Sequence, residues 1–232
     1  TACLVARRLR GKVLCPAFTF QASACAILAA GCEPVIVDVE ADTGLVSPER
    51  LADALRVTQA RAALLVAPYG IRCNFSEHAE VCAAAGADLI IDNAAGLGID
   101  RASVTTPIVA EHVAEVFSLH ATKPFGIGEG GAVFAAARME TALRSAMNFG
   151  LASHTADGTS AKPFWGINGK LSEVGAAIGL AVARTMPQRV RARQTMAREW
   201  IDTFAELPDI VFCRDPSLSP WQVFPIILSS ER

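Results

Sequence analysis

The sequence predicts an α/β protein with a largely parallel sheet covered by helices on both faces. Short apolar runs alternate with longer stretches of helical periodicity from residue 12 to residue 92. The short runs are almost continuously apolar, as expected for strands buried on both faces. Regular alternation of strand and helix is typical of parallel strands joined by helical crossovers.

The first four strands and three helices follow this rhythm. We expect strands at 12–16, 34–39, 62–67 and 87–92, and helices at 21–30, 47–56 and 76–85. Gly31 closes the first of these helices. Ser47 and Pro48 occupy the N-cap and the first turn of the second helix, where both residue types favour a helix start.

The rhythm changes after Asp92. Two further strands are expected at 115–119 and 131–136, and the connection between them is too short for a parallel crossover. We therefore expect one antiparallel neighbour in the sheet. A helix at 138–147 and a long loop at 148–169 follow.

The last part of the chain predicts a change of domain. Its expected elements are helices at 171–184 and 187–207 and strands at 210–213 and 221–227. We interpret 1–186 as a large domain that lacks its amino-terminal part, because Thr1 opens within what looks like a helix. Residues 187–232 then form an interdomain helix and the start of a small, incomplete α+β domain.

Composition excludes several classes of function. The net charge of −2 gives no electrostatic case for binding nucleic acid or an anionic membrane. The longest apolar run, 174–183, is half the length of about 20 residues that a spanning helix needs. Seven cysteines without a C-x-x-C pair predict buried free thiols in a reducing cytoplasm, and the histidines do not cluster with them as metal ligands would.

Asp92 is the first candidate for chemistry. It ends a buried strand in the segment LIIDNAAG. The carboxyl ends of strands in an open α/β sheet are where ligands bind. An aspartate that begins a loop can equally cap its own backbone, so the position alone leaves both interpretations open.

Lys123 is the second candidate. It lies in FSLHATKPFGIGEGG and is one of four lysines in a chain whose other basic residues are arginines. A primary amine can lose its proton and attack a carbonyl carbon, whereas a guanidinium cannot. A solvated loop lysine is the alternative at this position.

Gly126, Gly128 and Gly131 form a G-x-G-x-x-G pattern within the same segment. A dinucleotide-binding turn has to follow a strand and open a helix. Here the glycines precede the strand-like run AVFAAA. We therefore interpret them as a tight turn with close backbone approach and reject a nicotinamide-dependent oxidoreductase.

Five blocks in order along nearly the whole chain resemble the DegT/DnrJ/EryC1/StrS sugar aminotransferases. They are PAFTFQASACAILAAGCEPVIVDVE at 16–40, LLVAPYG at 64–70, IIDNAAGLG at 90–98, FSLHATKPFGIGEGG at 117–131, and NFG at 148–150 with GINGKLSEVGAAIGL at 166–180. The resemblance implies the aspartate-aminotransferase-like fold of the type I pyridoxal-phosphate enzymes. Its large domain has a mostly parallel mixed sheet.

The resemblance also assigns roles to single residues. Lys123 would bind the aldehyde of pyridoxal 5′-phosphate covalently and later move a proton. Asp92 would pair with the ring nitrogen, where a carboxylate keeps the ring protonated and electron-poor. The remaining expected cofactor contacts are Phe20 on the ring face, Ser118 and Thr1 at the phosphate, and Asn168 at the phosphate of the neighbouring subunit of a homodimer.

One departure from the family pattern concerns the block D-x-A-Q. Its glutamine is Ala95 here, so a polar contact near the phenolic oxygen of the cofactor is missing or comes from elsewhere.

The implied function is transfer of an amino group from an amino acid, glutamate by family analogy, to a nucleotide-linked keto-sugar. Two alternatives keep the fold. A deoxysugar dehydratase of the same family would carry histidine at the position of Lys123. A degenerate homologue would act as a non-catalytic regulator, an interpretation that Ala95 keeps open.

Overall fold

The computed structural model describes residues 1–99, 110–151, 164–207 and 210–228. Its centre is a six-stranded sheet in the order β2-β1-β3-β4-β5-β6. The strands are β1 (Gly11–Pro16), β2 (Cys32–Val37), β3 (Ala62–Val66), β4 (Asp88–Asp92), β5 (Val113–Ser118) and β6 (Gly131–Ala135). The first five strands are parallel and β6 pairs antiparallel with β5, which confirms the mixed sheet and its one antiparallel neighbour.

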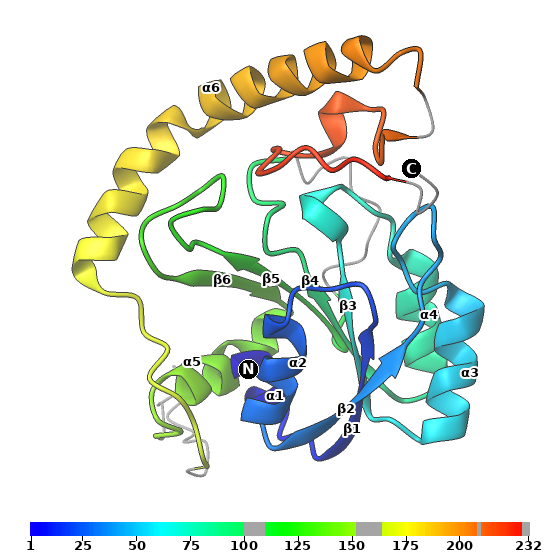
Figure 1. Cartoon of the computed structure of the whole chain (residues 1–232). Helices are drawn as coiled ribbons and strands as arrows, with labels where there is room; N and C mark the ends of the chain where they lie inside the picture. Colours follow the sequence, from blue (N-terminus) through cyan, green and yellow to red (C-terminus); the bar gives the residue numbers. More distant parts are fainter. Residues whose placement is uncertain (100–109, 152–163, 208–209, 229–232) are drawn as a thin grey trace.

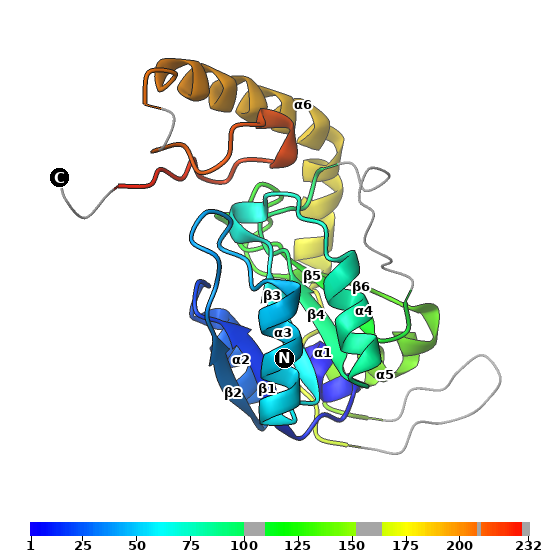
Figure 2. The same cartoon turned by 90° about the vertical axis from the view of Figure 1, so that its right-hand side faces the viewer.

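Helices cover both faces of this sheet (Figures 1 and 2). One face packs against α1 (Ala2–Ala6), α2 (Ala22–Ala29) and α5 (Glu140–Met147). The other face packs against α3 (Pro48–Thr58) and α4 (Ser76–Ala84). Alternate residues of each strand enter the two cores: Leu64 and Ile90 face α2, whereas Leu65 and Ile91 face α4.

The strand order creates a switch point beside β1. The chain passes from β1 to β2 on one side and then returns to place β3 on the other side. Connections leaving the sheet in opposite directions open a crevice at the carboxyl ends of the strands. Asp92 and Ser118, the last residues of β4 and β5, lie at this end of the sheet.

All seven cysteines are free among the described residues, and Cys3, Cys15, Cys32 and Cys82 are buried. Burial raises the pKa of Cys82 to about 12, so this thiol is protonated at neutral pH. The expectation of buried free thiols is confirmed for these four, whereas Cys25 is exposed and Cys73 and Cys213 are half-buried. None of the described helices has the length and apolar character that crossing a membrane requires.

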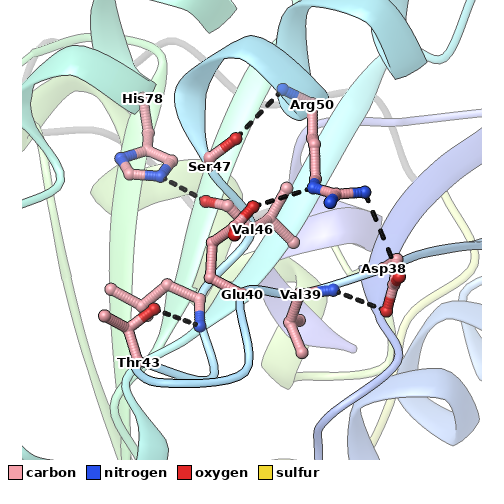
Figure 3. Close-up of polar contacts among 9 residues, drawn as sticks. Asp38, Val39, Glu40, Thr43, Val46, Ser47, Arg50 and His78 are labelled. Carbon is pink, nitrogen blue, oxygen red and sulfur yellow. Dashed lines mark hydrogen bonds and ion pairs between the residues drawn. The ribbon is translucent and has the colours of Figure 1, made fainter.

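The loop from β2 to α3 is fixed by polar contacts at both of its ends (Figure 3). Arg50 Nε donates to Glu40 Oε1 over 2.8 Å, and the ring nitrogen Nε2 of His78 contacts the Val46 carbonyl at 2.7 Å. Between these contacts Gly44 has φ +67°, and a Cβ there would come within 2.8 Å of the Phe18 ring. The loop therefore packs closely against Phe18, at the carboxyl end of β1.

A single long helix, α6 (Glu173–Thr203), replaces the two helices expected at 171–184 and 187–207. The expected break at Pro187 is wrong. Proline removes one backbone hydrogen bond, to the carbonyl of Ala183, and bends a helix without always ending it. Ala183 is exposed, so solvent can satisfy that carbonyl, and α6 curves along its length in Figure 1. The helix passes through the domain boundary predicted at 186/187.

Ser172 begins α6. Its Oγ accepts a hydrogen bond from the Gly175 N–H at 3.0 Å, which satisfies one unpaired donor of the first turn. Ser172→Ala should therefore lower the free energy of unfolding by about 1 kcal/mol, measured by urea denaturation. Ser172→Asp keeps a capping oxygen and should retain most of the stability. An equal loss in both variants would contradict the capping role.

The expected strands at 210–213 and 221–227 are wrong as regular strands. The described residues there form one antiparallel bridge, Val211 to Ile226, and a short 3-10 turn at Pro216–Leu218. Pro225, inside the second of these segments, has no N–H to donate to a ladder. The segment 210–228 instead lies beyond the carboxyl end of the sheet, next to α6 (Figure 1).

Candidate functional site

Asp92 anchors the site through two hydrogen bonds. Its Oδ2 accepts from Ser23 Oγ at 3.0 Å, and its Oδ1 accepts from the backbone N–H of Ala94 at 3.1 Å. Ser23 Oγ also lies 2.7 Å from Thr19 Oγ1. These contacts join the end of β4 to the first turn of α2 and fix the direction of the carboxylate.

The carboxylate of Asp92 is held in an environment that disfavours its charge. Burial raises its pKa above the ordinary value of aspartate, although Ser23, the Ala94 amide and the positive charge of Lys123 act in the opposite direction. The charge of a half-buried carboxylate is stabilised when a cation binds beside it. Asp92 is therefore suited to receive a cationic group from a ligand.

Lys123 lies in the compact connection between β5 and β6. The Lys123 N–H donates to the His120 carbonyl at 2.9 Å, and the Ala121 N–H donates to the Gly128 carbonyl at 2.7 Å. A Cβ on Gly126 would come within 2.4 Å of the Ala121 carbonyl oxygen, so only glycine fits there. The glycines make a tight turn before a strand, β6, and this confirms that they are not a dinucleotide-binding turn.

Lys123 follows the carboxyl end of β5, and Asp92 ends the neighbouring parallel strand β4. The positive charge of Lys123 acts to lower the pKa of Asp92. Lys123 Nζ donates to Gln222 Oε1 at 3.1 Å, and its side chain is half-buried. The structure thus brings together the two residues on which the expected chemistry depends.

Ser118 also lies beside Asp92. Its backbone N–H donates to the Ala94 carbonyl at 3.1 Å, two residues beyond Asp92. Its Oγ accepts from the His120 N–H at 3.2 Å. A hydroxyl that accepts in this way keeps its own proton for another acceptor, such as a phosphate oxygen.

Phe20 and Thr1 border the site from the other side. Phe20 lies on the turn that carries Ser23, accepts the Ser23 N–H at 3.1 Å and has a 75% exposed side chain. Thr1 precedes α1, and its Oγ1 donates to the Ala26 carbonyl of α2 at 3.4 Å.

Asn168 is separate from the other five predicted site residues. It is exposed in the segment before α6, where its Oδ1 accepts from Lys170 Nζ at 2.8 Å. Asn148 Oδ1 accepts from the same amine at 3.0 Å, and the amine lies 4.4 Å from the centre of the Phe149 ring. No described contact joins Asn168 to Asp92 or Lys123 within one chain.

Two residues of the site were not found from the sequence. Ser23 had a usable signal, because it is a hydroxyl inside an apolar helix, four residues after Thr19. Gln222 had none, since 99 residues separate it from Lys123 and only the fold brings them together.

Comparison with known proteins finds relatives along nearly the whole chain. A sequence model of the DegT/DnrJ/EryC1/StrS aminotransferase family matches residues 4–232. Protein Rv3402c of Mycobacterium tuberculosis is 33% identical over 186 residues, which are 78% of this chain and 44% of that protein. The dTDP-4-amino-4,6-dideoxy-D-glucose transaminase of Shigella dysenteriae is 27% identical over 226 residues, 96% of this chain and 59% of that enzyme.

Among solved structures, DesI in the presence of its TDP-sugar product superposes with a TM-score of 0.81 and 31% identity, over 99% of this chain and 58% of DesI. The chain thus spans about half the length of the curated relatives it matches. The fold is that of the aspartate-aminotransferase-like enzymes, as the resemblance implied. The chain belongs to the DegT/DnrJ/EryC1/StrS aminotransferase family.

Proposed function

We propose that the protein is a pyridoxal-phosphate-dependent aminotransferase that moves an amino group from an amino acid, glutamate by analogy, to a nucleotide-linked keto-sugar. The observation that carries this proposal is the joint placement of the Lys123 amine and the Asp92 carboxylate at the carboxyl end of the sheet. The names of the relatives, a dTDP-aminosugar transaminase and a protein with a TDP-sugar product, support the substrate class.

The residues present fit the cofactor of this family. A protonated pyridine nitrogen would supply a cation beside the half-buried carboxylate of Asp92. The hydroxyl of Ser118 can donate to a phosphate oxygen, and the exposed ring of Phe20 is available for stacking. Thr1 would contribute at the same phosphate. When bound, the cofactor supplies an aldehyde that takes up amino groups and a ring that withdraws electrons.

Within this site Lys123 would do the acid–base work. Its amine would hold the aldehyde of the cofactor, and as a free amine it would accept a proton from the donor carbon and return it. Asp92 would keep the ring nitrogen protonated, and Ser23 and the Ala94 amide hold its carboxylate in place.

The position of Asn168 supports a homodimer. Asn168 is exposed and apart from the Asp92 site, next to a group of exposed apolar side chains at the amino-terminal part of α6 and before it. We call this group the α6 apolar face; its members are Phe149, Leu151, Trp165, Leu171, Val174 and Ile178. Burial of this face against a second copy would bring Asn168 to the partner's cofactor phosphate.

Charge on the α6 apolar face should therefore separate the subunits. Val174 is 72% exposed and Ile178 is 44% exposed, and they share one side of the helix at i, i+4 spacing. Val174→Glu with Ile178→Glu should raise the dissociation constant of the full-length protein roughly a hundredfold, measured by analytical ultracentrifugation. Val57→Glu is the control. Val57 lies on the exposed side of α3, and its substitution should leave the dissociation constant unchanged. An unchanged association in the double variant would exclude this face as the interface.

Lys123 argues against the dehydratase alternative, which requires histidine at that position. The non-catalytic alternative rests on Ala95, which is buried and leaves the carboxylate and the amine in place. The free cysteines are consistent with a cytoplasmic location, which we also propose.

Turnover tests the proposed function directly. The full-length protein is incubated with pyridoxal phosphate, glutamate and a series of nucleotide-linked keto-sugars, and 2-oxoglutarate and amino-sugar are measured. We expect one keto-sugar to give both products in equal amounts. Cofactor binding at Lys123 without amino transfer to any sugar would instead favour the non-catalytic homologue.

A further inference from the structure

Gln222 reaches the predicted catalytic amine from the carboxyl-terminal segment. Its Oε1 accepts from Lys123 Nζ at 3.1 Å, while its Nε2 lies 3.4 Å from Thr122 Oγ1. One amide thus contacts two consecutive residues of the β5–β6 connection, and its side chain is half-buried. None of the motifs that carry the family resemblance includes position 222.

The residue before Gln222 is held in an unusual conformation. Trp221 is 5% exposed and has φ +50°, in the left-handed region that residues with a Cβ rarely adopt. Its N–H donates to Ser219 Oγ at 3.0 Å and its ring nitrogen donates to the Pro216 carbonyl at 2.7 Å. Its carbonyl accepts from Arg193 of α6 at 2.6 Å. Backbone strain of this kind persists where the surroundings determine the conformation, and it occurs often at functional sites.

The same turn is attached to the edge of the site. Ser219 is fully buried, and its Oγ donates to the Tyr69 carbonyl at 3.2 Å. Tyr69 follows β3, beside the switch point of the sheet, and also has a positive φ of +55°. The backbone that carries Gln222 is therefore fixed both to α6 and to the carboxyl end of the sheet.

We propose that Gln222 is a positioning residue for Lys123: its amide oxygen, aimed by the Trp221 turn, holds the amine in place whenever that amine is not bonded to cofactor. The proposal rests on the function proposed above. A lysine side chain has four rotatable bonds and loses considerable entropy when it is fixed. Donation of one N–H to Gln222 fixes the amine while leaving the lone pair of its neutral form free to accept a proton.

Gln222→Met tests this role, because methionine has similar length without the amide. Two rates are measured on the full-length protein. The first is the rate at which pyridoxal phosphate added to cofactor-free protein bonds to Lys123, followed by absorbance. The second is the rate of the glutamate half-reaction, followed over a range of glutamate concentrations.

Both maximal rates should fall roughly tenfold, while the glutamate concentration that gives half the maximal rate stays unchanged. Thr122→Val leaves Gln222 in place without the hydroxyl beside its Nε2, so a smaller loss, about threefold, is expected. Val223→Ala is the control, because Val223 is next to Gln222 and 46% exposed. Both of its rates should equal those of the unaltered protein.

The outcomes separate this inference from the function it rests on. If the unaltered protein bonds pyridoxal phosphate at Lys123 and Gln222→Met does so at the same rate, the positioning role is wrong and the proposed function stands. A change only in the half-saturating concentration would assign Gln222 to donor binding and also contradict the proposal. If the unaltered protein does not bond the cofactor at Lys123, both proposals fail.

Discussion

Lys123→Ala should abolish both the bond to pyridoxal phosphate and amino transfer. The amine of Lys123 can attack an aldehyde, and its charge reaches Asp92. General acid–base catalysis by a placed group contributes about 10² to 10⁴-fold, so turnover with supplied cofactor should fall at least roughly a thousandfold. Absorbance of the bound cofactor and 2-oxoglutarate formation are the two measurements.

Two variants control this prediction. Lys123→Arg keeps the positive charge, but a guanidinium does not bond an aldehyde at neutral pH, so it should be as inactive as alanine. Lys12→Ala changes an exposed lysine at the amino end of β1, away from the site, and should leave turnover unchanged. Turnover in Lys123→Ala close to that of the unaltered protein would refute the assignment.

Asp92→Asn should lower turnover by about 10² to 10³-fold while the protein still takes up cofactor. Asparagine fits the same space and can still accept from the Ala94 amide, but it carries no charge to keep the ring nitrogen protonated. Because the bond through Lys123 does not depend on that charge, the cofactor should remain attached. Equal turnover in the two proteins would mean that Asp92 does not face the ring nitrogen.

The same substitution should stabilise the cofactor-free protein. Burial raises the pKa of Asp92, so its ionised form is less stable in the folded protein than in the unfolded chain. Ionisation of Asp92 does not destabilise the folded protein at a pH below the ordinary pKa of aspartate. The destabilisation grows as the pH rises toward the raised pKa of the folded state, and it is constant at higher pH. The melting temperature of cofactor-free Asp92→Asn should therefore exceed that of the unaltered protein at neutral pH. In strong acid the two melting temperatures should be equal. A lower melting temperature at neutral pH would contradict this account.

The sheet could be predicted well from the sequence because its signals are local. Continuous apolar strands mark each β–α unit, Ser47 caps α3, and the short connection between β5 and β6 marks the antiparallel pair. The positions of Asp92 and Ser118 at the carboxyl edge of the sheet can be predicted in the same way, because each residue ends a strand.

The predictions from the sequence are wrong where contacts between distant parts of the chain determine the local structure. Pro187 predicts a helix break, yet α6 continues because the carbonyl it leaves unpaired is exposed to solvent. The segment 221–227 looks like a strand, yet it lacks a regular ladder and instead contacts α6 through Trp221 and Lys123 through Gln222. The contact of Gln222 with Lys123 belongs to this class, because no local pattern marks a side chain that acts across the fold.

Bonding of pyridoxal phosphate at Lys123 tests the account most directly. The full-length protein is mixed with the cofactor, treated with borohydride to make the bond permanent, digested and analysed by mass spectrometry. We predict a cofactor-modified peptide that contains 117–131, with the modification on Lys123 and none on Lys12 or Lys170. Modification at another lysine, or none at all, would contradict the central claim.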